Sequence, residues 1–157
     1  ADMAELGADM RARPNEDRRK VDSHDVKEMP TRLARQNIRL ASCLAVVLNK
    51  KSVDADVLRI VRKVALDTAA GHSLNIVQWM CAPNPRAESV PYQECGGLMS
   101  GTLEMWTGMT AERLHRYLMF LRRIGVLEWR EVRQSHGTWL LTERVYTLYL
   151  RIMRGPV

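Results

Sequence analysis

The arginine residues of the C-terminal third are the side chains of this sequence whose type and spacing best fit a chemical task. Residues 110–157 contain nine basic residues, all of them arginine, against four acidic residues. A guanidinium group can donate two parallel hydrogen bonds to one phosphate or base edge, which a lysine ammonium group cannot do. The segment therefore favours nucleic-acid recognition, while arginines that only keep a basic domain soluble are the alternative.

One expected helix presents many of these side chains. Apolar residues between Thr110 and Ile124 recur at helical spacing and predict a buried face made of Leu114, Tyr117, Leu118, Leu121 and Ile124. Thr110 is expected to cap this helix, and Glu112 lies away from the buried face. The residues of this helix that we expect to contact a ligand are Thr110, Arg113, His115, Arg116, Met119 and Arg123.

The surrounding sequence predicts the elements that position this helix. The turn "TGMT" separates it from a short helix around residues 101–106, and Gly125 is expected to end it. The alternating stretch "VLEWREV" and the stretch "WLLT" predict two strands joined by the turn "RQSHGT". Thr142 is then expected to cap a final helix whose buried face contains Val145, Leu148, Tyr149 and Ile152.

This order of helix, turn, helix, hairpin and helix resembles the winged helix-turn-helix proteins, especially the MarR-like transcriptional regulators. The matching residues are Leu121, Gly125, Val126, Leu127, Leu141, Thr142 and Glu143. Val145 stands where that family usually has glycine, and the resemblance covers only the last third of the chain. It implies that helix 110–124 enters the major groove of double-stranded DNA while the wing at residues 130–138 contacts the backbone. The candidate DNA-binding residues of the wing are Arg130, Arg133, Gln134, Ser135 and His136.

The rest of the chain divides by composition. Residues 1–28 are polar and of mixed charge, which predicts an arm or tail. Residues 29–71 predict two helices, with Ser52 capping the second and Gly71 ending it. The first of them is apolar nearly all round from Leu40 onward, which favours self-association. Residues 73–157 form the expected winged domain, with a long loop at residues 82–97.

Several function classes are not expected. The longest apolar run, "LASCLAVVL", is too short to span a bilayer, and the first residues do not resemble a secretion signal. Cys43, Cys81 and Cys95 are widely spaced, which favours reduced thiols in a cytoplasmic protein, associated with the nucleoid if it is bacterial. No metal-ligand spacing or activated-nucleophile motif is present, so we expect neither a cofactor nor catalysis.

The sequence thus predicts a mainly α protein with a small β-hairpin wing, a winged helix-turn-helix domain plus N-terminal helices. The expected function is sequence-specific binding of double-stranded DNA by a homodimeric transcriptional regulator. A replication or partition protein of a plasmid or phage is one alternative. A winged-helix adaptor that binds proteins rather than DNA is another, and the N-terminal helices could also bind a protein partner.

Overall fold

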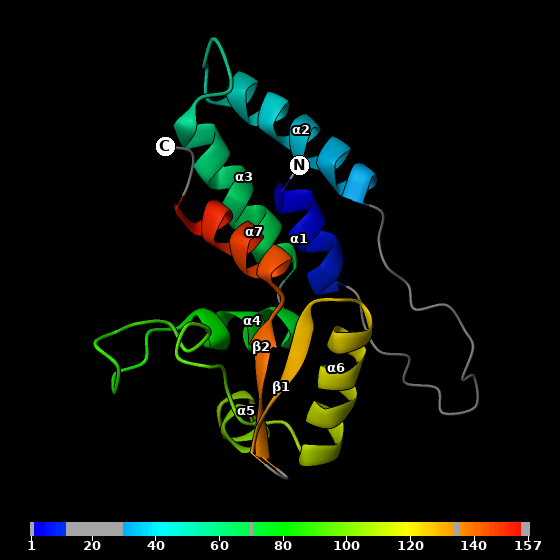
Figure 1. Cartoon of the computed structure of the whole chain (residues 1–157). Helices are drawn as coiled ribbons and strands as arrows, with labels where there is room; N and C mark the ends of the chain where they lie inside the picture. The colour runs from blue at the N-terminus through cyan, green and yellow to red at the C-terminus, as the bar shows by residue number, and fades with distance from the viewer. Residues whose placement is uncertain (1, 12–29, 70, 134–135, 155–157) are drawn as a thin grey trace, which may run out of the picture.

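The computed structural model describes residues 2–11, 30–69, 71–133 and 136–154. Within these ranges the protein is mainly helical and has one antiparallel two-stranded hairpin, which confirms the predicted fold class (Figure 1). The elements in chain order are α1 (Asp2–Arg11), α2 (Pro30–Val47), α3 (Ala55–Thr68), α4 (His72–Cys81), α5 (Ser100–Thr107), α6 (Ala111–Arg123), β1 (Leu127–Arg133), β2 (His136–Leu141) and α7 (Glu143–Arg154).

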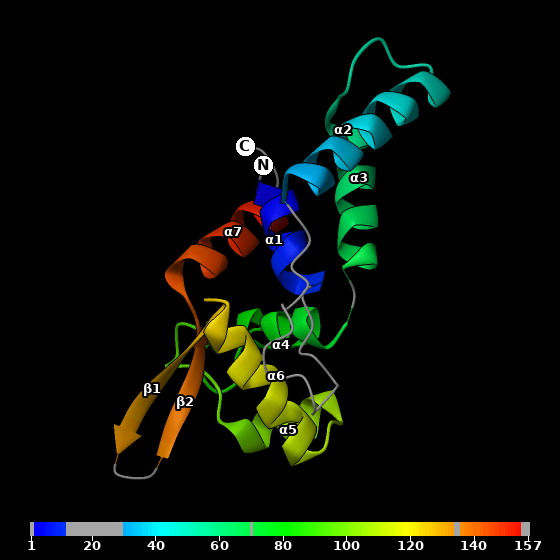
Figure 2. The same ribbon diagram turned by 90° about the vertical axis from the view of Figure 1, so that its right-hand side faces the viewer.

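The elements are arranged in two halves that meet at α1 and α7. The antiparallel pair α2 and α3 forms one end of the molecule, and α4, α5, α6 and the hairpin form the other (Figures 1 and 2). The main core is built where α1, α4, α5, α6 and α7 meet, and its fully buried side chains include Leu6, Ile76, Met80, Leu103 and Leu118. A smaller apolar cluster joins α2 to α3 through Ala41, Ala45, Val57 and Val61.

The polar arm expected over residues 1–28 contains a packed helix, which corrects the prediction for residues 2–11. Leu6 and Met10 of α1 are buried in the main core. Asp9 is also fully buried and accepts a hydrogen bond from Arg144 of α7 at 2.7 Å. Residues 12–28 lie outside the described residues. Helix α1 packs against α2, α3, α4 and α7, and the Asp9–Arg144 pair joins residues more than 130 positions apart, so local patterning alone did not reveal this packing.

The first of the two helices expected over residues 29–71 is present as α2, but two of the predicted helix ends are wrong. Asp54, rather than Ser52, caps α3, and its carboxylate accepts a hydrogen bond from Val57 N at 3.0 Å. The ammonium group of Lys50 lies 2.8 Å from the same carboxylate and lowers the pKa of Asp54. The second helix ends at Thr68, and Gly71 instead lies in extended backbone immediately before α4.

The second half of α2 is not buried on more than one side within a single chain. Ala41 and Ala45 are buried, whereas Val46 and Val47 are each 78% exposed. Ile38, one turn before Ala41, is 65% exposed. The α2–α3 pair therefore leaves a large aliphatic surface uncovered.

Candidate nucleic-acid interface

The turn between α5 and α6 has the geometry that the sequence predicts. Gly108 ends α5 with φ +65°, a left-handed conformation that glycine adopts without steric cost. Met109 is buried beneath the turn, and the Thr110 hydroxyl accepts a hydrogen bond from Arg113 N at 3.4 Å. The turn is thus fixed on the core, and it sets the direction in which α6 leaves it.

The inner face of α6 anchors the helix firmly. Leu114, Leu118 and Leu121 are at most 1% exposed, and Tyr117 is buried beside them. Phe120, which the sequence pattern did not assign to this face, is also buried. Burial of side chains along the whole length of α6 fixes its rotation about its own axis, so the outer face is held in one orientation.

The outer face of α6 collects the candidate residues as predicted. Among the described elements, no helix or strand covers this side of α6, which lies at the edge of the molecule (Figures 1 and 2). Met119 is 42% exposed among the cationic side chains, and the Arg123 guanidinium lies 5.7 Å from the centre of the Phe120 ring. The candidate residues that are exposed here are Thr110, Arg113, His115, Arg116, Met119 and Arg123.

The C-terminal end of α6 is tied to the last helix. Gly125 has φ +75°, which explains the glycine that ends this helix in the sequence. The Thr142 hydroxyl, expected to cap α7, donates a hydrogen bond to the carbonyl oxygen of Gly125 at 2.9 Å. Val126 N also donates to the carbonyl oxygen of Leu121 at 2.9 Å. These bonds fix where the hairpin begins relative to α6.

The hairpin depends on a close contact between a tryptophan and a glycine. Trp129 pairs with Trp139 across the strands, and their ring centres are 4.9 Å apart. A Cβ atom on Gly137 would lie 2.2 Å from the Trp129 ring and 2.8 Å from the carbonyl oxygen of Arg130. Glycine at residue 137 therefore leaves the space that the Trp129 ring occupies.

The charges of the wing give weaker support than those of α6. Arg130 is exposed, but its guanidinium lies 3.5 Å from the carboxylate of Glu128. The two arginines and two glutamates of β1 sum to zero charge. Gln134 and Ser135 lie outside the described residues, as do the side chains of Arg133 and His136. Contacts between the wing and DNA therefore stay a prediction.

The long loop at residues 82–97 braces the hairpin, a role that the sequence did not predict. The Gln93 side chain accepts a hydrogen bond from Leu141 N at 2.7 Å and donates one to the Leu141 carbonyl at 2.9 Å. The Thr138 hydroxyl donates to the carbonyl oxygen of Gly96 at 2.6 Å. Gly97 passes so close to β2 that a Cβ atom would lie 2.3 Å from the Trp139 carbonyl oxygen. The pair Gly96–Gly97 was the one signal in the sequence for this close approach.

Other kinds of site leave no signature in the described residues. No group of three or more His, Cys, Asp and Glu side chains there is placed to hold a metal ion. No helix among the same residues has the length and apolar character needed to cross a membrane. Burial raises the pKa of the Cys81 thiol to about 12, so this thiol stays protonated at neutral pH.

Comparisons with protein-family models, with curated proteins and with solved structures gave no match to this chain. The resemblance to winged helix-turn-helix regulators thus continues to rest on the residues and the order of elements described above.

Proposed function

We propose that this chain binds double-stranded DNA, with α6 in the major groove, and acts as a homodimeric transcriptional regulator. The observation that carries the proposal is the outer face of α6. It exposes Arg113, Arg116 and Arg123 together with His115, on a helix fixed at both ends and along its buried face. A cationic face on a rigid helix at the edge of a molecule matches the electrostatic footprint of a DNA-binding protein.

The size of α6 suits this role. Its 13 residues give a length of roughly 20 Å at 1.5 Å per residue. The major groove, about 12 Å wide, admits one α-helix, and residues near the N-terminal end of that helix usually contact the bases. Arg113 and Arg116 lie in the first two turns, where a guanidinium can donate two hydrogen bonds to guanine. Arg123, in the last turn, is better placed for a phosphate.

The uncovered surface of α2 and α3 supports self-association. A hollow of about 310 Å³ lies between α1, α2 and α3 and is bordered by Ile38, Val53 and Leu58. None of the described residues that line it is charged, which favours an apolar occupant over nucleic acid. We propose a second copy of this chain as the occupant. Ile38 lies at the edge of the hollow, so in a two-fold dimer the Ile38 side chain of each copy can pack against the hollow of the other. Such a dimer would read two half-sites about 34–36 Å apart.

The proposal is tested by replacing Arg116 with alanine. If Arg116 contacts a base, the variant should bind the preferred duplex about 5- to 150-fold more weakly, corresponding to roughly 1–3 kcal/mol. Binding to random duplex should change much less. Fluorescence anisotropy with a duplex selected by the wild-type protein, beside a random duplex of equal length, measures both. Equal losses would reduce Arg116 to a phosphate contact, and a wild-type protein that binds neither duplex would contradict the proposal.

A protein-binding adaptor is the second candidate, and Met119 is the observation that favours it. This residue is 42% exposed in the middle of the α6 outer face, where an apolar side chain could contact a protein as readily as a thymine methyl group. Salt dependence separates the two functions. Phosphate contacts release counterions, so duplex binding must weaken steeply as salt rises.

A further inference from the structure

A second arginine-bearing surface lies on α2, outside the helix-turn-helix. Residues 30–53 contain five basic residues and no acidic residue. The neighbouring helix α3 has three basic residues but also Asp56 and Asp67. The positive charge of α2 is therefore unusual within this protein, because no acidic residue of the same helix balances it.

The arginines of α2 share one outward face. Arg32, Arg35 and Arg39 are spaced by three and four residues, which places them together on the side of the helix opposite to Ala41 and Ala45. Arg35 and Arg39 are exposed. Among the described residues, neither of these two arginines has an ion pair or a hydrogen bond through its side chain. Their guanidinium groups are thus available to an outside anion.

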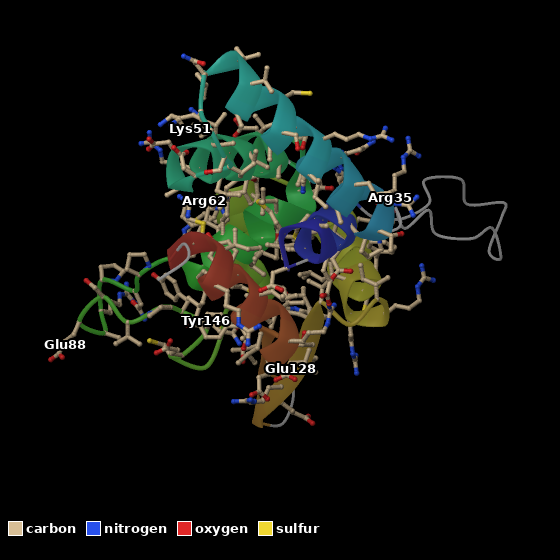
Figure 3. The ribbon with its side chains drawn as sticks, turned by 90° about the horizontal axis from the view of Figure 1, so that it is seen from above. Arg35, Lys51, Arg62, Glu88, Glu128 and Tyr146 are labelled. Atoms are coloured by element: carbon tan, nitrogen blue, oxygen red, sulfur yellow. The ribbon has the colours of Figure 1, made fainter. Side chains whose placement is uncertain are left out.

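This surface lies on the same side of the molecule as the α6 interface. Seen from above, Arg35 projects from the first half of α2 toward the side on which α6 lies, whereas Arg62 of α3 lies on the opposite side (Figure 3). The view turned by 90° also shows the first turns of α2 and the outer side of α6 on one face of the molecule (Figure 2). A polyanion bound along α6 would therefore pass the same side of the protein as Arg35.

We propose that Arg35 and Arg39 bind backbone phosphates of the DNA duplex that α6 reads, beside the segment held by α6. The inference rests on the proposed function and extends its footprint from one helix to two. Guanidinium groups suit phosphate, and such contacts add affinity without sequence preference. Ala34 and Ala41, which line the hollow, lie on the other side of α2 from this arginine pair, and Ile38, three residues after Arg35, lies between the two surfaces.

The test is the salt dependence of duplex binding by the double variant R35A/R39A. Each phosphate contact contributes about 0.9 to the slope of log K against log salt, so two lost contacts should reduce the slope by about 1.8. Between 50 and 200 mM salt, the fold-loss of affinity should then be roughly tenfold smaller than for wild type. The charge-preserving variant R35K/R39K should keep most of the slope. Circular dichroism melts check that each variant is folded. Both residues are exposed, so we expect the substitutions to leave the fold intact.

Two further variants make the result decisive. R59A/K63A removes the same charge from residues that line a hollow with Arg62 on the opposite side, and it should leave the slope nearly unchanged. R113A/R116A weakens the α6 interface itself.

If R113A/R116A weakens binding but R35A/R39A does not alter the slope, the inference fails and the proposed function stands. Equal slope changes from R35A/R39A and R59A/K63A would show a net-charge effect and overturn the inference. If R113A/R116A has no effect, or the wild-type protein does not bind duplex, the proposed function fails and the inference falls with it.

Discussion

At the scale of single residues, glycines decide how the hairpin is built. Gly137→Ala should destabilise the protein, because its Cβ atom would meet the Trp129 ring at 2.2 Å and the Arg130 carbonyl oxygen at 2.8 Å. We expect a loss of about 1–3 kcal/mol in the free energy of unfolding, measured by urea denaturation. Gly101→Ala is the matched control, since nothing lies within 4 Å of its Cβ position in α5. That variant should leave the free energy of unfolding unchanged or slightly raised, because alanine favours a helix over glycine. A Gly137→Ala protein as stable as Gly101→Ala would contradict the expected clash.

Residue types predicted local geometry well where the signal was local. Gly108, Thr110 and Gly125 were assigned to the turn, the cap and the end of α6 from sequence alone, and the structure confirms all three. The prediction that Ser52 caps α3 is wrong, because Ser52 and Asp54 are both good capping residues and lie only two positions apart. The pair of hydrogen bonds between Gln93 and Leu141 could not be predicted, since it joins residues 48 apart in the sequence.

At the scale of elements, α1 depends on α7 for its place. Arg144→Ala removes the guanidinium that donates to the fully buried Asp9 carboxylate and also pairs with Glu5. Leaving a buried carboxylate without this partner should cost about 2–3 kcal/mol of unfolding free energy. Arg151→Ala breaks a longer, exposed contact to Asp2 and should cost less than about 1 kcal/mol. Thermal melts of the two variants compare them, and equal effects would show that α1 is not held by the buried pair.

Helix α1 could not be predicted from its local sequence. Met3, Leu6 and Met10 follow helical spacing, but α1 has only ten residues and several charges among them. Short helices gain most of their stability from tertiary packing rather than from intrinsic propensity. The packing partners of α1 lie in α2, α3, α4 and α7, all beyond the polar stretch that follows it. The C-terminal elements were easier to predict, because α5, α6, the hairpin and α7 follow one another closely and pack against each other.

At the scale of the whole molecule, the proposed base recognition and the proposed self-association belong to different halves. The half that contains α6 presents a cationic face, while the α2–α3 half presents an uncharged hollow beside exposed aliphatic side chains. Between them, α1 and α7 pack against both halves (Figure 1). A dimer formed through the α2–α3 surface would thus hold the α6 helices of the two copies at a fixed distance and orientation. The distance between the two α6 helices would set the spacing of the two DNA half-sites.

The dimer is tested by charging its expected surface. Ile38→Asp places a carboxylate at the edge of the hollow, where burial against a second copy would be unfavourable. The wild-type protein should sediment as a dimer and this variant as a monomer in analytical ultracentrifugation. Met105→Asp is the control, because Met105 is 72% exposed on α5, away from α2 and α3, and should leave the mass unchanged.

The same variant connects assembly to DNA binding. Monomeric Ile38→Asp should retain weak, salt-sensitive binding to random duplex through α6, because that helix is unchanged. It should lose the preference for a two-half-site duplex, since two linked α6 helices bind adjacent half-sites far more tightly than one helix alone. A wild-type protein that is monomeric at every concentration yet prefers such a duplex would show that DNA, rather than the α2–α3 surface, brings the two copies together.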